Sequence, residues 1–297
     1  MELALTVAGI VAPVFLIAGA GFAWCRSGTP YPTEFVTRLA MTLAVPCLIF
    51  TALMETQIDP AALTALSLAS LAAYALVLGL SWAVVAILRL DRRSFVAPLT
   101  FGNTGNLGLP LALFAFGEIG LGYAVVVFAV MAVMTFTIGI WLVSGTGSVR
   151  AVLREPMVGA TLLGTLFLVQ GWTTPDWLTN TLRLAGQMAI PLMLLTLGVA
   201  VARLKPGRIG QAVWLSGVKL TLCIAAGVLV GRVFGLDPVA FGVLVLQLAT
   251  PVAVTSYLLA ERYDADANAV AGLVMVSTAM SVAALPITLS FLLPGVS

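Results

Sequence analysis

The chain has 297 residues, of which 61% are hydrophobic and 9% are charged, and its mean hydropathy is +1.12. Soluble domains are about one quarter charged, so this composition excludes a soluble globular protein and indicates one that crosses a membrane several times. The net charge is only +2 and histidine is absent, which excludes a nucleic-acid partner and the commonest metal ligand. Three scattered cysteines, Cys25, Cys47 and Cys223, predict neither a disulfide framework nor a metal site. We therefore expect no metal and no cofactor.

Apolar runs long enough to span a bilayer follow one another along the whole chain. A spanning helix needs about 20 predominantly apolar residues. We predict ten spans and an all-α polytopic membrane protein, and the first run reads as a retained span because no positive residues precede it. The spans lie near residues 3–24, 34–54, 61–90, 94–116, 119–143, 156–172, 177–202, 211–234, 238–260 and 266–293.

Basic residues are concentrated in alternate connections between these runs. One set of connections carries Arg26, Arg89, Arg92, Arg93, Arg150, Arg154, Arg203, Lys205, Arg208 and Arg262. The other set is mainly acidic, with Arg183 and Arg232 as its basic residues. Because cytoplasmic connections are enriched in Lys and Arg, this pattern predicts that both termini lie on the non-cytoplasmic side of the cell (inner) membrane.

The two halves of the chain resemble each other. Arg38-Leu-Ala-Met-Thr-Leu-Ala-Val-Pro46 shares its Arg, Leu, two Ala and Pro with Arg183-Leu-Ala-Gly-Gln-Met-Ala-Ile-Pro191, at an offset of 145 residues. Each half holds five predicted spans, an odd number, so the second copy must be inverted in the membrane. We predict a first repeat at 1–143, a second, inverted repeat at 156–297, and a short cytoplasmic linker at 144–155.

Predicted span four contains the stretch Phe101–Pro110, which is unusually rich in helix-breaking residues. Its three glycines weaken a helix, and its proline lacks an N–H and crowds the preceding turn. A proline at a similar offset, Pro251, lies in span nine. We predict that spans four and nine are broken helices that cross near the membrane midplane, where inverted-repeat transporters bind substrate; close helix packing is the alternative for the glycines. The crossover residues are Gly102, Gly105, Gly108, Pro110 and Pro251, and Pro46 and Pro191 predict kinks in spans two and seven.

Polar side chains beside the predicted breaks are the candidate substrate contacts. The amide of Asn103 can donate to a carboxylate without burying a fixed charge. Thr104 and Asn106 either contact substrate or satisfy freed backbone groups, and Gln247 and Thr250 flank Pro251 in the same way. Lys219, well inside span eight, is either a functional charge or a side chain that snorkels or pairs structurally.

At these residues the sequence resembles the auxin efflux carrier family, which includes plant PIN exporters and bacterial permeases. The motifs are Asn103-Thr-x-x-x-Gly108-x-Pro110, Leu259-Ala-Glu-Arg-Tyr263 and Ala284-Leu-Pro-Ile-Thr-Leu289, and the similarity covers the whole chain. The resemblance implies the fold of bile-acid symporters, with spans 1, 2, 6 and 7 as a scaffold and spans 3–5 and 8–10 as a mobile transport domain. It also implies an elevator motion.

We therefore expect a secondary transporter of small organic anions, either auxin-like aromatic carboxylates or aliphatic mono- and dicarboxylates, that functions as a homodimer. No nucleophile–base pair or acid pair is visible at membrane depth, so we do not expect an enzyme. Two alternatives remain open. One is a Na⁺- or H⁺-coupled symporter of the bile-acid type, and the other is a non-transporting receptor built on the same fold.

Overall fold

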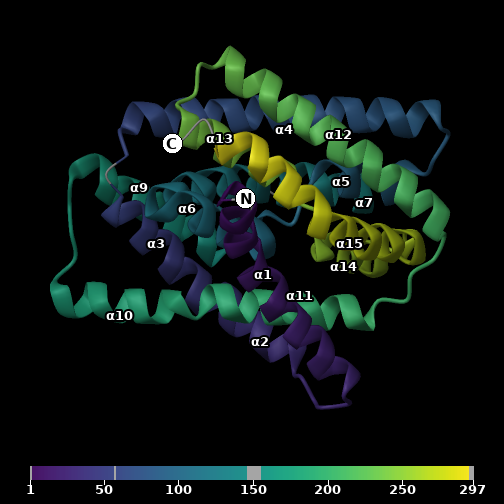
Figure 1. Cartoon of the computed structure of the whole chain (residues 1–297), viewed down its shortest axis with the longest axis horizontal. Helices are drawn as coiled ribbons and strands as arrows, with labels where there is room; N and C mark the ends of the chain where they lie inside the picture. Colours follow the sequence, from purple (N-terminus) through teal and green to yellow (C-terminus); the bar gives the residue numbers. More distant parts are fainter. Residues whose placement is uncertain (1, 57, 146–154, 294–297) are drawn as a thin grey trace.

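The computed structural model describes residues 2–56, 58–145 and 155–293, and every regular element within them is a helix (Figure 1). Among these residues, seven helical segments are long and apolar enough to cross a membrane: Ala4–Arg26, Thr33–Glu55, Pro60–Ile87, Thr104–Ser144, Asp176–Arg203, Ile209–Val233 and Ala267–Leu292. This confirms an all-α chain with several candidate spans. Most of the predicted 144–155 linker lies outside the described residues.

The first half of the chain contains long helices and several that are interrupted. Its elements are α1 (Glu2–Arg26), α2 (Thr33–Leu39), the π-helical turn η1 (Ala40–Ala44), α3 (Val45–Glu55), α4 (Pro60–Ile87), α5 (Arg92–Thr100), the π-helical turn η2 (Thr104–Gly108), α6 (Leu109–Met134), the π-helical turn η3 (Thr135–Gly139) and α7 (Ile140–Ser144). Within α6, Gly117 has a φ of 67°, which only glycine adopts readily, so the run bends there. The bend falls between predicted spans four and five.

The second half repeats the alternation of long and interrupted helices. Its elements are α9 (Pro156–Gln170), α10 (Asp176–Gln187), α11 (Ala189–Arg203), α12 (Ile209–Val233), α13 (Pro238–Leu248), α14 (Val254–Arg262) and α15 (Ala267–Leu292). The two predicted kink prolines lie at matching places. Pro46 is the second residue of α3, directly after η1, and Pro191 is the third residue of α11, directly after the break at Met188.

Aspartate side chains begin four of the helices. Asp59, Asp91, Asp237 and Asp266 accept hydrogen bonds from the first-turn backbone N–H groups of α4, α5, α13 and α15. An acidic N-cap satisfies donors that the helix leaves free and opposes the positive end of the helix dipole. The acidic residues between predicted spans are therefore partly structural, because they define where the helices start.

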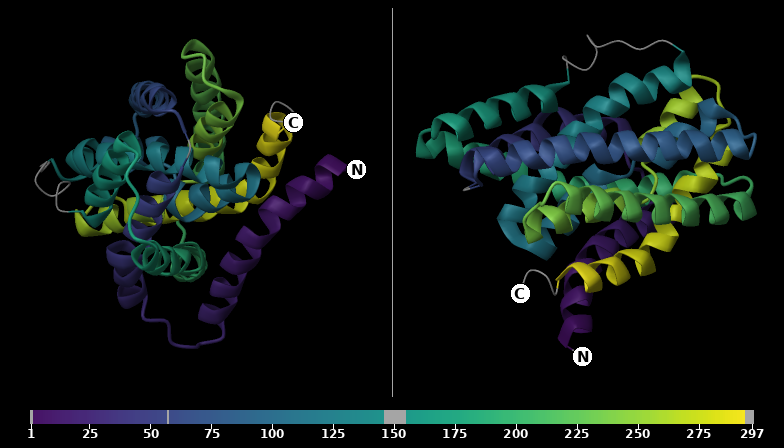
Figure 2. Two further views of the ribbon diagram at one scale, coloured as in Figure 1. Left: turned by 90° about the vertical axis from the view of Figure 1, so that its left-hand side faces the viewer. Right: turned by 90° about the horizontal axis from the view of Figure 1, so that it is seen from above.

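The helices lie on two opposite sides of a central layer that contains the interrupted segments. The pair α4 and α12 lies on one side of the molecule, the row of α10 and α11 lies on the opposite side, and α5, α6 and α13 lie between them (Figures 1 and 2). Helix α1 packs along α11, and α3 packs along α9 and α10. The beginning of α1 and the end of α15 lie on the same side of the molecule (Figure 2).

Small residues permit the close contacts of α1 and α11. A Cβ added at Gly198 would overlap the carbonyl of Ala18, and one added at Gly21 would overlap the carbonyl of Leu195. Close backbone approach is the usual way in which membrane helices gain packing energy, because lipid supplies little hydrophobic drive between them. We infer that α1 and α11 form one rigid wall of the molecule.

Candidate functional site

Two helices stop and restart at the centre of the molecule. Helix α5 ends at Thr100 and helical structure resumes with η2 at Thr104, while α13 ends at Leu248 and α14 begins at Val254. The residues predicted to interrupt the helices lie in or just after these gaps: Gly102 in the first, Pro251 in the second, and Pro110 as the second residue of α6. The interruptions therefore follow the local chemistry of glycine and proline.

The two gaps contact each other directly. Gly102 and Val252 form an isolated antiparallel bridge, and the backbone N–H of Asn103 donates to the carbonyl of Pro251 at 2.7 Å. A Cβ at Gly102 would overlap the hydroxyl of Thr250. Glycine is thus needed at 102 for close approach between the two segments. We call residues 101–104 and 249–253, where the segments meet, the helix junction.

Asn103 is 5% exposed, and its backbone and side chain have different surroundings. Its carbonyl accepts hydrogen bonds from the N–H groups of Leu107 (3.1 Å) and Gly108 (3.2 Å), so the backbone begins η2. Its side-chain Nδ2 is buried without a hydrogen-bond partner, and the buried hydroxyl of Thr104 also has none. A buried donor without a partner costs about 1–3 kcal/mol. Two such donors in consecutive residues mark this place as a candidate binding site.

Gln247 and Thr250 lie on the other side of the helix junction. The fully buried Gln247 donates from Nε2 to the carbonyl of Ala124 at 3.5 Å, while its Oε1 has no partner. A Cβ at Gly108 would overlap this amide, so the glycine makes room for it. The hydroxyl of Thr250 donates to the carbonyl of Gln247 at 2.6 Å and is therefore already engaged. Gln247 retains a free acceptor, whereas Thr250 contributes mainly its carbonyl.

The side chain of Lys219 reaches the backbone carbonyl of Thr250. Its Nζ donates to Thr250 O at 2.9 Å and lies 3.8 Å from Cys223 Sγ, and the side chain is only 2% exposed. Lys219 is ten residues into α12, about 15 Å along a helix that starts at Ile209. The structure thus places this ammonium inside the protein, where it pairs with a backbone carbonyl. Among the described residues, no carboxylate lies within ion-pair distance of it.

Sequence reasoning did not place Lys219 at the helix junction. The available signal was a helical stripe of small and polar residues, Ser216, Lys219, Cys223 and Gly227, all on the buried face of α12. Such a stripe indicates that α12 is covered by another helix at this depth. It does not identify which backbone carbonyl the ammonium meets, because that depends on how α12 packs on α13.

Two cavities are lined in part by the segments that follow the helix junction, α6 for one and η2 with α14 for the other. The first, the Arg203 cavity, has a volume of about 310 Å³ and is lined by Thr33, Thr37, Ala40, Met41, Asn106, Met193, Thr196, Ala200, Arg203, Leu204, Val254, Thr255, Tyr257 and Leu258. Asn106 therefore faces open space, whereas Asn103 is buried and does not line this cavity. The second, the Arg183 cavity, has a volume of about 710 Å³ and lies between α3, α6 and the end of α10.

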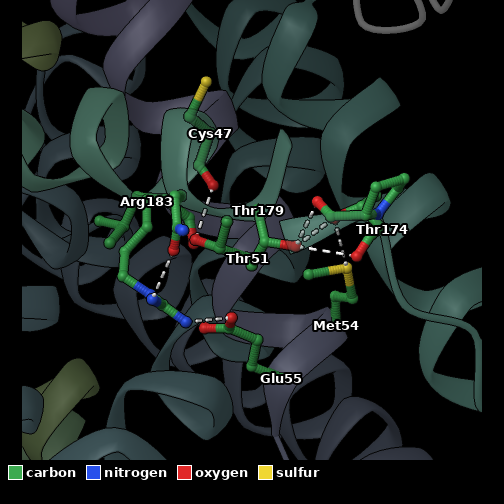
Figure 3. A network of polar contacts seen from close by, with 10 residues as sticks. Cys47, Thr51, Met54, Glu55, Thr174, Thr179 and Arg183 are labelled. Atoms are coloured by element: carbon green, nitrogen blue, oxygen red, sulfur yellow. Dashed lines mark hydrogen bonds and ion pairs between the residues drawn. The ribbon is translucent and has the colours of Figure 1, made fainter. Parts of the chain in front are cut away.

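Three residues that line the Arg183 cavity, Thr51, Glu55 and Arg183, are engaged in polar contacts with other protein groups (Figure 3). Arg183 forms an ion pair with Glu55 at 2.5 Å and donates to Asn180 Oδ1 at 3.3 Å. Thr51 lines the same cavity but donates its hydroxyl to the carbonyl of Cys47 at 2.9 Å. With Glu118 also on its wall, this cavity has one more acidic than basic lining residue. It is a poor place for an anion.

Among the described residues, no group of three or more His, Cys, Asp or Glu side chains is arranged to hold a metal ion. What the helix junction offers instead is neutral donors, backbone groups at helix ends and one ammonium. Such a junction within an all-helical apolar chain is typical of membrane transporters, in which interrupted helices bind the cargo.

Comparison with known proteins identifies the family. Residues 6–152 and 145–289 match the family described as membrane transport protein, and the chain belongs to that family. This confirms the resemblance to the auxin efflux carrier family.

Individual relatives are transporters by name. The chain is 28% identical over 270 residues to an uncharacterized transporter of Methanothermobacter thermautotrophicus, covering 85% of this chain and 86% of the relative. It is 23% identical over 303 residues to a putative malonate transporter of Rhizobium meliloti, covering 93% of each chain. The protein is therefore a membrane transporter, as the sequence predicts.

Proposed function

We propose that this protein is a secondary transporter of small organic anions, with the substrate bound at and beside the helix junction by Asn103, Thr104 and Asn106 and with Gln247 and Thr250 on the opposite wall of the site. The observation that carries the proposal is the side-chain amide of Asn103, a buried donor without a partner where two interrupted helices meet. An anion that leaves water needs donors to replace its hydration. Amide and hydroxyl donors supply them at a lower desolvation cost than a buried arginine.

The charges and hydrogen-bond donors at the site indicate the chemical class of the substrate. Asn103 and Thr104 present donors, the ammonium of Lys219 lies behind the carbonyl of Thr250, and α14 starts beside the site with no side-chain cap on its first N–H groups. All of these favour negative charge. The relative named as a putative malonate transporter supports carboxylates as the class.

We further propose ten spans in two inverted repeats, at 1–143 and 156–297. The gaps at 101–103 and 249–253 lie at similar places in the two halves, and Gly117 divides the 41-residue run Thr104–Ser144 into two parts. The family match also falls into two segments that meet at residues 145–152. In this reading Gly105, Gly108 and Pro110 shape the first broken helix, and Pro251 shapes the second.

Transport would then use an elevator motion of spans 3–5 and 8–10 against a scaffold of spans 1, 2, 6 and 7. The close glycine contacts of α1 with α11 and of α3 with α9 support a rigid scaffold. The two cavities lie between scaffold elements and the elements proposed to move. We place the protein as a homodimer in the cell inner membrane, with both termini outside the cytoplasm.

Lys219 bears on the alternative of sodium coupling. In many transporters, unwound carbonyls and helix C-terminal ends coordinate Na⁺. Here the carbonyl of Thr250, just after α13, already accepts a hydrogen bond from the ammonium of Lys219. A fixed cation in this position competes with a sodium ion for the same oxygen. We therefore favour transport without sodium coupling.

The test is binding and uptake by the purified protein. Thermal stabilisation should be measured with indole-3-acetate, malonate and propionate, and uptake of the best ligand should follow in proteoliposomes with and without a sodium gradient. We expect at least one carboxylate to stabilise the protein and to accumulate without sodium. Stabilisation by neutral amides of the same acids, with none by the acids, would overturn the proposal.

A further inference from the structure

Arg203, at the end of α11, has its guanidinium bonded only to neutral groups. It donates to the hydroxyl of Thr33 at 2.6 Å and to the carbonyl of Tyr31 at 3.0 Å. Within the described ranges, ion pairs join Arg183 to Glu55 and Arg208 to Asp266, and none involves Arg203. The guanidinium has five N–H donors, so further donors remain for an anion.

The Arg203 cavity and the Arg183 cavity differ in charge because of this arginine. Arg203 is the one charged residue that lines the Arg203 cavity, among the described residues. The Arg183 cavity has Arg183 neutralised by Glu55, with Glu118 in addition. Of these two, the Arg203 cavity is therefore the one that attracts an anion, and it is the cavity that Asn106 of the proposed site faces.

Arg203 also lies where this cavity opens to the surface. It lines both the Arg203 cavity and a neighbouring surface groove formed by Pro32, Thr33, Glu34, Phe35, Arg38 and Arg203. Glu34 and Arg38 belong to the groove alone and balance each other in charge. An anion that enters the Arg203 cavity from this groove therefore passes the guanidinium of Arg203.

The polar groups of the Arg203 cavity include Asn106 of η2 and Arg203 at the end of α11. Met193 lies against η2, since a Cβ at Gly105 would lie 3.2 Å from its Cε. Arg203 is ten residues further along α11, a rise of about 15 Å. Between them the wall is formed largely by apolar side chains: Met41, Met193, Leu204, Val254 and Leu258. The volume of 310 Å³ is at the lower limit of about 300–1,000 Å³ for small-molecule sites.

We propose that Arg203 binds the second carboxylate of dicarboxylate substrates whose first carboxylate lies at the helix junction. The planar guanidinium fork suits bidentate pairing with a carboxylate, and the apolar wall suits a methylene chain between the two charges. This inference rests on the proposed function and specifies its substrate class. Arg203 is then the residue that distinguishes dicarboxylates from monocarboxylates.

The experiment compares matched ligands on three proteins. Binding is measured for the dicarboxylates from malonate to sebacate, a range that includes chains long enough for the cavity, and for the monocarboxylates of equal carbon number, from propionate to decanoate. The proteins are the parent, Arg203→Gln and Arg26→Gln. Arg26 is the matched control because it ends α1 near the same connection, with its guanidinium stacked 5.8 Å from the ring centroid of Phe22.

Arg203→Gln should weaken dicarboxylate binding by about ten- to a hundredfold, the loss expected for a charged hydrogen bond. Monocarboxylate binding should change less than about threefold, and Arg26→Gln should leave both classes unchanged. The dicarboxylate that loses most in Arg203→Gln gives the length that the cavity accepts. If Arg203→Gln is not monodisperse, Arg203→Lys replaces it, because that variant keeps the charge but loses the fork and should still bind dicarboxylates more weakly.

The outcomes separate this inference from the function on which it rests. Parent protein that binds monocarboxylates, with no selective loss of dicarboxylates in Arg203→Gln, would overturn the role of Arg203 and leave the anion site in place. Equal losses for both ligand classes would also overturn it, because Arg203 would then act on any anion. Parent protein that binds neither class would overturn both proposals.

Discussion

Asn103→Ala separates a binding role from a structural role, because the two predict opposite changes in stability. The backbone of Asn103 makes the contacts that hold the helix junction together, namely the bond to Pro251 O and the bonds from Leu107 and Gly108. All of these survive the substitution. The side-chain Nδ2 has no partner in the protein, so its removal breaks no hydrogen bond of that atom.

The expected changes in stability and in affinity both follow from the unpartnered side-chain amide of Asn103. A buried unsatisfied donor costs about 1–3 kcal/mol, and deleting it should offset the packing lost with the amide. The ligand-free variant should therefore unfold at the same temperature as the parent or slightly above it. A hydrogen bond to a charged group contributes about 1.5–3 kcal/mol, so carboxylate binding should weaken about ten- to a hundredfold.

The assay is thermal unfolding with and without the carboxylate that stabilises the parent most, followed by direct titration. Asn268→Ala is the control, because it removes the same group from an exposed position in the first turn of α15. We expect Asn268→Ala to match the parent in both measurements. A lower unfolding temperature for Asn103→Ala combined with unchanged affinity would refute the reasoning, since Asn103 would then be a structural cap.

Three further predictions test the surroundings of the site. Gly102→Ala should destabilise the protein by about 1–3 kcal/mol, because the added Cβ would overlap Thr250. The control Gly9→Ala, where the added Cβ would have no atom within 4 Å, should be neutral or stabilising. Equal unfolding temperatures for the two variants would mean that the two segments of the helix junction can separate. Lys219→Met leaves the carbonyl of Thr250 without its donor, so the variant should unfold at a lower temperature than the parent in choline buffer. Sodium buffer should restore part of the loss, because Na⁺ can then bind the freed carbonyl. A variant as stable as the parent in both buffers would show that this hydrogen bond is dispensable. In a cysteine-free background, Asp176→Cys should react with an impermeant maleimide applied to whole cells and Lys205→Cys should not; the reverse labelling would invert the proposed topology.

Local chemistry explains why much of the helix junction was predictable from the sequence. Glycine and proline act on their own turn of helix, so the interruptions at 101–103 and 249–253 could be located without knowledge of the packing. Asn103 and Asn106 look alike in the sequence, yet Asn103 is buried and Asn106 lines a cavity. Which of two neighbouring polar residues faces a cavity depends on helix rotation, and that is decided by contacts from other helices.

Long-range contacts explain why the positions of Lys219 and Arg203 could not be predicted from the sequence. The meeting of Lys219 with Thr250 O joins residues 31 positions apart, and the bonds of Arg203 to Tyr31 and Thr33 join residues about 170 positions apart. Nothing in the local sequence around Arg203 distinguishes it from the other arginines in connections between spans. Its position at a cavity mouth becomes visible only when α11 is packed beside α2.

The buried ammonium also has an electrical consequence for the proposed motion. If α12 moves with the bound substrate, Lys219 carries a positive charge with it, because it lies inside the helix packing and donates to Thr250 O. A bound monocarboxylate would balance this charge, whereas a bound dicarboxylate would leave a net charge of about −1 on the moving part. One elementary charge that crosses the whole membrane exchanges about 2.3 kcal/mol per 100 mV. In proteoliposomes, an imposed potential should therefore act on the empty return step for both ligand classes, and on the loaded step for a dicarboxylate but not for a monocarboxylate. A loaded step that responds to the potential with a monocarboxylate bound would show that the charge of Lys219 does not move with the substrate.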